Sequence, residues 1–183
     1  LGVNKSQAVT FNFRPDAGTS QAAINGFTQA GKLWSNILTD NVTINIDIAF
    51  KSLSGNAIAN TRYTREEVSY TNFRNALTAD ATSNDDTTAI TNLPTGSSFD
   101  LWINLTGDNP NGAASLTPYL DNDGSQNNST IRLTTANMKA LGLATTQLSD
   151  SSISFNSNVS FDFDRSNGIS AGSYDFVGMA AHE

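Results

Sequence analysis

Alternating apolar and polar residues predict the clearest strand of the chain between residues 42 and 50. Its apolar positions are Val42, Ile44, Ile46, Ile48 and Phe50. A period of two places these side chains on one face of an extended segment. Shorter apolar runs predict strands at residues 8–13, 99–105 and 129–133, and a hairpin or bent strand pair at 152–164. We therefore expect a sheet with one buried face.

Apolar residues spaced three and four apart predict a helix that begins after Thr19 or Ser20, which serves as its N-cap. The residues expected on its core face are Ile24, Phe27, Gly31, Trp34 and Leu38. A second helix is predicted over residues 60–80, where Thr64-Arg65-Glu66-Glu67 has the form of a capping box. A short helix is predicted over 136–141, capped by Thr134 or Thr135 and ended by Gly142.

The polar segments between these elements are predicted to be loops and turns. Residues 80–98 are rich in Thr, Asn and Asp and are expected to form a surface loop. Residues 107–112 surround Pro110 and are expected to turn. No internal repeat or linker interrupts the pattern, so we predict that residues 1–183 form a single domain.

Composition places the chain among globular proteins and excludes several functions. It has 183 residues, of which 38% are hydrophobic and 15% charged. A net charge of −7, from 17 acidic and 10 basic residues, offers no basic surface for nucleic acid or an anionic membrane. The chain has no cysteine, which excludes disulfides and thiolate zinc ligands.

Hydropathy predicts no transmembrane segment, because no stretch approaches the ~20 apolar residues that a membrane-spanning helix needs. Leu1-Gly2-Val3 is not the charged start of a signal peptide. If the protein is exported, we expect its signal to have been removed or to lie outside this sequence.

An apolar helical run over residues 174–181 ends in His182-Glu183. In the H-E-x-x-H motif, two histidines four residues apart bind Zn²⁺ from one helix face, and the glutamate between them acts as general base. His182 is the only histidine, so the second ligand of such a motif would fall outside this sequence. Spacing alone favours a histidine that simply ends a surface helix.

Further segments bear on this choice. They are residues 11–13, 18–27, 33–35, 41–48, 121–124, 140–143 and 153–156, and above all Phe161-Asp162-Phe163-Asp164, Gly168-Ile169 and 174–183. Together they resemble a group of secreted bacterial metzincin-like zinc metalloproteases, in which the last stretch runs directly into the zinc helix. The resemblance covers nearly the whole chain.

The resemblance implies an α+β, zincin-like fold of metzincin type, with a twisted mixed sheet and two long helices, incomplete at its C-terminus. The chain would be the N-terminal part of a catalytic domain. His182 would bind Zn²⁺ together with two later histidines, and Glu183 would be the catalytic base. The implied function is that of a secreted or cell-surface bacterial endopeptidase acting on a protein or peptide substrate. That substrate would bind as an added strand at an exposed sheet edge.

One imidazole and one carboxylate cannot replace three zinc ligands. We therefore expect the 183-residue chain by itself to bind Zn²⁺ weakly and to lack peptidase activity.

Two alternatives remain open. Ca²⁺ is a second candidate cofactor, since the oxygen side chains of residues 162–168, with Asp175, resemble a calcium loop. Their spacing departs from the EF-hand, and an ordinary turn with Asp175 near a helix N-terminus is favoured. Residues 121–125 also resemble a calcium loop, and an ordinary turn is favoured there too. As a different function, a β-rich extracellular module that binds glycan or surface polymer would explain the acidic, Asn- and Thr-rich surface, but not the terminal helix.

Overall fold

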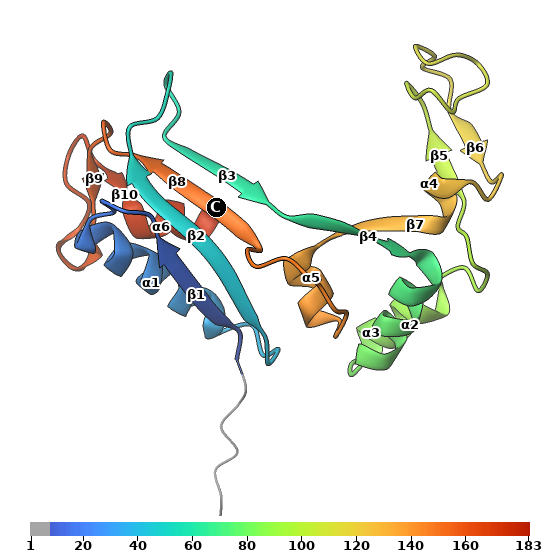
Figure 1. Cartoon of the computed structure of the whole chain (residues 1–183), viewed down its shortest axis with the longest axis horizontal. Coiled ribbons are helices and arrows are strands. Elements are labelled where there is room, and N and C mark those ends of the chain that lie inside the picture. The colour runs from blue at the N-terminus through green and yellow to red at the C-terminus, as the bar shows by residue number, and fades with distance from the viewer. Residues whose placement is uncertain (1–7) are drawn as a thin grey trace, which may run out of the picture. The chain divides into compact units, whose positions relative to one another are not determined.

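The computed structural model of the chain describes residues 8–183 (Figure 1). Leu1-Gly2-Val3, considered above as a signal-peptide start, lies outside the described residues. The described chain forms two compact units. Unit 1 contains the chain up to Thr64, Thr134–Ala140 and Ala144–Glu183; unit 2 contains Arg65–Leu133 and Leu141–Leu143. Because one domain can contain two such units, the single domain stays a prediction.

Unit 1 is built on a four-stranded mixed sheet with the order β1-β2-β8-β3. Its strands are β1 (Thr10–Pro15), β2 (Thr43–Lys51), β8 (Ser151–Asn156) and β3 (Ala59–Tyr63). The first three run parallel, and β3 runs antiparallel to β8 at one edge. Helix α1 (Gln21–Ser35) connects β1 to β2, as parallel neighbours require. The mixed sheet and the α+β class are confirmed.

The core of unit 1 lies between one face of this sheet and the helices α1 and α6 (Phe176–His182) (Figure 1). Phe27, Phe155 and Phe176 meet there and are each 0% exposed. The Phe176 ring centroid lies 5.3 Å from that of Phe27 and 4.7 Å from that of Phe155. The opposite side of the sheet is polar; Arg14 there forms a 2.8 Å ion pair with Asp47. The alternation in β2 therefore predicted the buried face correctly.

Two glycines let aromatic rings approach helix α1 closely. A Cβ at Gly26 would collide with the ring of Phe176, and one at Gly31 would lie 2.9 Å from the ring of Phe13. Real Cβ atoms essentially never come this close to other atoms. Only glycine at these positions allows α1 to pack at its present distance from α6 and β1.

Helix α1 begins as predicted, but its core face is only partly the expected one. The Ser20 hydroxyl accepts a hydrogen bond from the amide of Ala23 at 3.3 Å, which confirms Ser20 as N-cap. Trp34 and Leu38, expected in the core, are 44% and 38% exposed. The buried residues are mostly small: Ala23, Gly26, Phe27, Ala30 and Gly31. The prediction was wrong here because it followed large apolar residues, whereas neighbouring rings fill the space beside small ones.

Unit 1 also contains helix α5 (Thr135–Ala140) and three short elements. The helix was predicted over 136–141, so both of its ends lie one residue earlier than expected. The three short elements are β9 (Phe161–Asp162), the 3-10 helix η1 (Arg165–Asn167) and β10 (Tyr174–Asp175). Two strands lie in the range 152–164, where a hairpin or bent strand pair was predicted, but they form no hairpin, because β9 pairs in parallel with β10. Strand β8 instead lies between β2 and β3, where both of its edges are paired.

A buried carboxylate joins α5 to the ends of two sheet strands. Asp150 is 2% exposed and accepts hydrogen bonds from the Thr135 hydroxyl at 2.7 Å and the Asn45 amide at 2.7 Å. Lys139 forms an ion pair with it at 2.5 Å and also donates to the carbonyl of Thr43. Burial opposes ionisation of Asp150, but the hydrogen bonds from Lys139, Asn45 and Thr135 outweigh it and lower its pKa.

Unit 2 contains two two-stranded sheets and three helices. Strand β4 (Arg65–Ser69) pairs with β7 (Thr130–Thr134), of which only Thr134 belongs to unit 1. Strand β5 (Leu101–Ile103) pairs antiparallel with β6 (Tyr119–Asp121). The helices are α2 (Tyr70–Asp80), α3 (Asn84–Thr91) and α4 (Gln126–Ser129). The strands predicted over 99–105 and 129–133 are confirmed, the first in shortened form.

Two sequence predictions in this region are wrong. Residues 60–80 do not form one helix; β3 and β4 precede α2. The expected loop over 80–98 contains α3, which begins with a capping box in which Ser83 and Asp86 bond each other's backbone amides. None of the described helices is long and apolar enough to cross a membrane.

Polar side chains occupy much of the interior of unit 2. Asn128 is 0% exposed, and its side-chain amide donates to the carbonyls of Phe99 and Asp121, each at 3.0 Å. Tyr70 packs on Phe99 with a centroid distance of 4.9 Å, and its hydroxyl donates to the carbonyl of Pro94 at 2.8 Å. Hydrogen bonds therefore hold the segments of this unit together.

Candidate functional site

Helix α6 holds the candidate residues, and its start is firmly fixed. The Asp175 carboxylate accepts a hydrogen bond from the Gly178 amide at 3.0 Å and so caps the helix. Arg165 forms a 3.1 Å ion pair with the same carboxylate. Phe176 and Val177 are buried directly after the cap. The predicted place of Asp175 at the helix N-terminus is confirmed.

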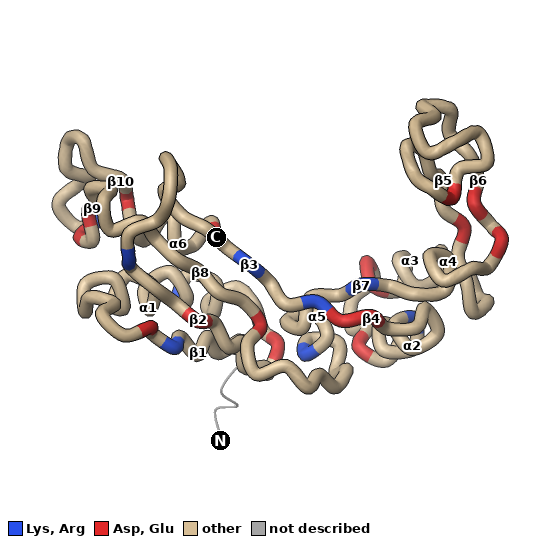
Figure 2. The backbone as a smooth tube through the Cα atoms, turned by 45° about the horizontal axis from the view of Figure 1, so that its top comes forward, with Lys and Arg blue, Asp and Glu red and all other residues tan. Residues whose placement is uncertain are grey.

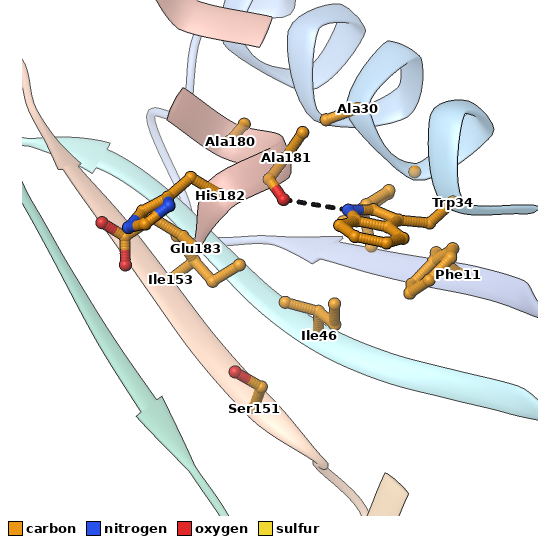
Figure 3. A pocket seen from close by; sticks show the side chains of 12 residues that line it. Phe11, Ala30, Trp34, Ile46, Ser151, Ile153, Ala180, Ala181, His182 and Glu183 are labelled. Atoms are coloured by element: carbon orange, nitrogen blue, oxygen red, sulfur yellow. Dashed lines mark hydrogen bonds between the residues drawn. The ribbon is translucent and has the colours of Figure 1, made fainter. Parts of the chain in front are cut away.

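His182 and Glu183 lie at the other end of α6, and both are exposed (Figure 3). The Thr61 hydroxyl, on the outer strand β3, donates a hydrogen bond to the Glu183 carboxylate. The backbone amide of Glu183 donates to the carbonyl of Met179 at 3.1 Å. The structure thus places both residues at one helix end, with the carboxylate held against a sheet edge.

Trp34 stabilises the same helix end. Its indole Nε1 donates to the carbonyl of Ala181 at 2.9 Å (Figure 3). The last carbonyls of a helix have no partner within it, so this bond satisfies one of them. Neither Trp34 nor Thr61 was predicted to touch the site. No sequence pattern could indicate these contacts, since they join residues 147 and 122 positions apart.

A pocket of about 300 Å³ lies beside the helix end (Figure 3). His182 and Glu183 line it together with largely apolar side chains, among them Phe11, Trp34, Ile46 and Ile153. Such a surface can accept an apolar group next to the histidine and the carboxylate.

The residues present fit part of a zinc site. His182 offers an exposed imidazole, and Glu183 a carboxylate beside it, as the first ligand and the base would require. Among residues 8–183, no three His, Asp or Glu side chains come together in a way that could hold a metal ion. Two further zinc ligands would have to come from residues outside this sequence.

The acidic turn considered for Ca²⁺ is organised by its own hydrogen bonds. Asp162 accepts from the hydroxyl and the amide of Ser170 at 2.6 and 2.9 Å, and these bonds lower the pKa of Asp162. Asp164 accepts from the hydroxyl and the amide of Ser166, which lower its pKa in the same way. Asp123, in the second such turn, accepts from the Ser125 amide at 2.8 Å. These are ordinary turns stabilised by carboxylates, and Ca²⁺ binding stays a prediction.

In comparisons with known proteins, no family model, no curated protein and no solved structure matched this chain. The case for a function therefore depends on the geometry above and on the sequence resemblance.

Proposed function

We propose that the chain is part of a zinc-dependent endopeptidase in which His182 is a metal ligand and Glu183 the general base. The observation that carries the proposal is a capped and anchored helix, α6, which ends in an exposed histidine and glutamate beside an outer sheet strand. The proposal requires two more ligands from residues outside this sequence.

The proposed roles follow from the chemistry of the two side chains. Bound zinc would polarise a peptide carbonyl and lower the pKa of a water molecule. Glu183 would accept a proton from the attacking water and pass it to the leaving amine. The hydrogen bond from Thr61 favours one position of the Glu183 carboxylate and so limits its motion before the reaction.

The substrate would be a protein or peptide bound in extended form along β3. This strand is paired on only one side, with β8, so its other edge can pair with an added strand. The second outer strand, β1, is separated from β3 by β2 and β8. Of the two outer strands, β3 carries the hydroxyl that contacts Glu183, which supports it as the place of the scissile bond.

The test uses the protein with its natural downstream residues. Glu183→Gln keeps the side-chain size but removes the proton acceptor, so the variant should keep its zinc and lose about 10²–10⁴-fold in peptidase rate. His182→Ala should lose zinc as well as activity. Glu66→Gln serves as a matched control and should behave like the wild type. The measurements are zinc content by mass spectrometry and cleavage of a peptide library.

Two outcomes would overturn these roles. Near-normal cleavage by Glu183→Gln at full zinc occupancy would remove Glu183 as the base. Unchanged zinc content in His182→Ala would remove His182 as a ligand. We further propose a secreted or cell-surface location in a bacterium. Detection of the protein only in the cytoplasmic fraction would contradict it.

A further inference from the structure

A second pocket, of about 580 Å³, lies entirely within unit 2. It is lined by Glu67 of β4, Asp108, residues 125–127, and Thr130 and Arg132 of β7. Every one of these residues has a side chain that can form hydrogen bonds. The volume is within the range of small-molecule sites. A ligand that fits this pocket must therefore be polar over most of its surface.

Asn127, which lines this polar pocket, is held in place by hydrogen bonds. The side-chain amide of Asn127 donates to Asp121 at 2.8 Å and to Asp108 at 3.2 Å. Its side-chain oxygen accepts from the Ser125 hydroxyl at 2.6 Å. Asp121 is 3% exposed, and Asn128, which follows Asn127 in the sequence, is fully buried. The side chain of Asn127 is therefore preorganised, which reduces the entropy lost when a ligand binds to it.

Arg132 supplies a donor group that the protein itself does not use. No hydrogen bond or ion pair of its guanidinium is found among residues 8–183. Glu67 and Asp108 supply acceptors in the same pocket. Figure 2 shows basic and acidic positions together along β4 and β7, and acidic positions just before β5 and at the end of β6. The pocket thus offers strong donors and strong acceptors side by side.

This mixture of charges favours a ligand whose groups both donate and accept hydrogen bonds. An anion would be repelled by Glu67 and Asp108, a cation by Arg132, and an apolar molecule would leave all these groups without partners. A sugar hydroxyl both donates and accepts hydrogen bonds, so neighbouring hydroxyls can bond a carboxylate and a guanidinium at once. We propose that this pocket of unit 2 binds a carbohydrate. The proposal goes beyond the peptidase function and does not depend on it.

The test is titration of the ¹⁵N-labelled 183-residue chain with individual sugars, followed by amide chemical shifts. The probes are galactose, N-acetylglucosamine, maltose and cellobiose, each raised to tens of millimolar. At least one should cause saturable shifts at Gln126, Asn127 and Arg132. Arg132→Ala should weaken this binding about tenfold or more, as loss of a hydrogen bond to a charged group implies. Arg62→Ala, which removes an exposed arginine of unit 1, should leave it unchanged.

Other results would overturn the proposal. They are the absence of saturable shifts at these residues with all four sugars, and equal binding by Arg132→Ala. Shifts at Asp108, Asp121 and Asn127 with CaCl₂ alone would identify a cation site instead, and shifts at Arg132 with inorganic phosphate alone an anion site. If Arg132→Ala loses the dispersed amide signals of unit 2, Gln126→Ala replaces it, with Gln147→Ala as control. Among residues 8–183, no three His, Asp or Glu side chains come together to hold a metal ion, so none of these outcomes bears on the peptidase proposal.

Discussion

The interiors of the two units differ in how much apolar side chain they contain, although each also buries three polar residues. In unit 1, the buried rings of Phe27, Phe155 and Phe176 form one cluster with the aliphatic residues of β2 and β8. In unit 2, the buried hydrophobic residues are few, namely Val68, Tyr70 and Leu133, and Asn109, Asp121 and Asn128 are also buried. Apolar burial is non-directional, whereas a buried amide needs partners in fixed places. We therefore expect unit 1 to depend on side-chain volume and unit 2 on hydrogen bonds.

The largest expected effect tests the volume dependence of unit 1. Phe176→Ala should lower the free energy of unfolding by about 3–5 kcal/mol, because it leaves a cavity among several rings. Urea denaturation followed by Trp34 fluorescence in a Trp102→Phe background measures it. The control is Tyr174→Ala, since Tyr174 is 48% exposed. An unchanged midpoint for Phe176→Ala would show that the aromatic cluster is not what stabilises unit 1.

The next effect concerns the buried Asp150 of unit 1 and its ion pair with Lys139. Asp150→Asn should cost about 1.5–3 kcal/mol at neutral pH, the range for hydrogen bonds to charged groups. The folded-state pKa of Asp150 is lowered, so its contribution is present above the ordinary aspartate pKa of about 3.9 and is lost as pH falls through the folded-state value.

Acid denaturation curves check this prediction. Wild-type stability should fall more steeply than that of Asp150→Asn as pH is lowered from about 4. The other carboxyls with lowered pKa values, such as Asp162 and Asp164, are common to both proteins. The difference between the two curves therefore isolates Asp150. Parallel curves would show that ionisation of Asp150 does not stabilise the folded state.

A smaller effect tests the hydrogen bonds of unit 2. Asn128→Ala removes the donor to the carbonyls of Phe99 and Asp121 and should cost about 1–3 kcal/mol for buried groups left unpaired. Hydrogen exchange of the β5 and β6 amides should accelerate, while that of β2 stays as it is. Asn122→Ala, at an exposed position, is the matched control. Equal exchange in both variants would mean that Asn128 fills space and does not hold the segments together.

The smallest effect compares the same substitution in both units. Ser20 caps α1 and Ser83 caps α3, so replacing either serine by Ala should cost about 1 kcal/mol. Helix α3 has no buried residue, whereas α1 has five. Ser83→Ala should therefore abolish exchange protection of residues 84–91, while Ser20→Ala should weaken that of α1 only in its first turn. Similar loss along both helices would show that core anchoring does not govern their local stability.

The same contrast explains which parts of the fold could be predicted from sequence. The alternation in β2 reports burial directly, whereas the apolar spacing of α1 indicated a helix but only part of its buried face; both elements were found. Residues 60–69 contain helix formers, but β3 pairs with β8 across the chain, and this tertiary pairing overrides local propensity. Helix α3 has no apolar face to detect, and the loop prediction overlooked the capping-box spacing of Ser83 and Asp86.

The candidate site also has features that local sequence predicts and features that depend on tertiary packing. The local pattern of an apolar run after Asp175 predicted the helix that carries His182 and Glu183, and its cap. The hydrogen bonds from Trp34 and Thr61 could not be predicted, because they depend on how α1 and β3 pack on the rest of unit 1. The partnership of Asp150 with Thr135 and Lys139 is also nonlocal, and no apolar period marks it.

The glycines of α1 have a consequence for how this sequence can vary. Because the rings of Phe176 and Phe13 occupy the space beside Gly26 and Gly31, even one added methyl group would force a ring or a helix to move. In a library in which every position is randomised and folded clones are selected, these two positions should be among the least variable. In the selected clones, positions 26 and 31 should therefore accept almost only glycine. This restriction would reflect the close approach of α1 to α6 and β1.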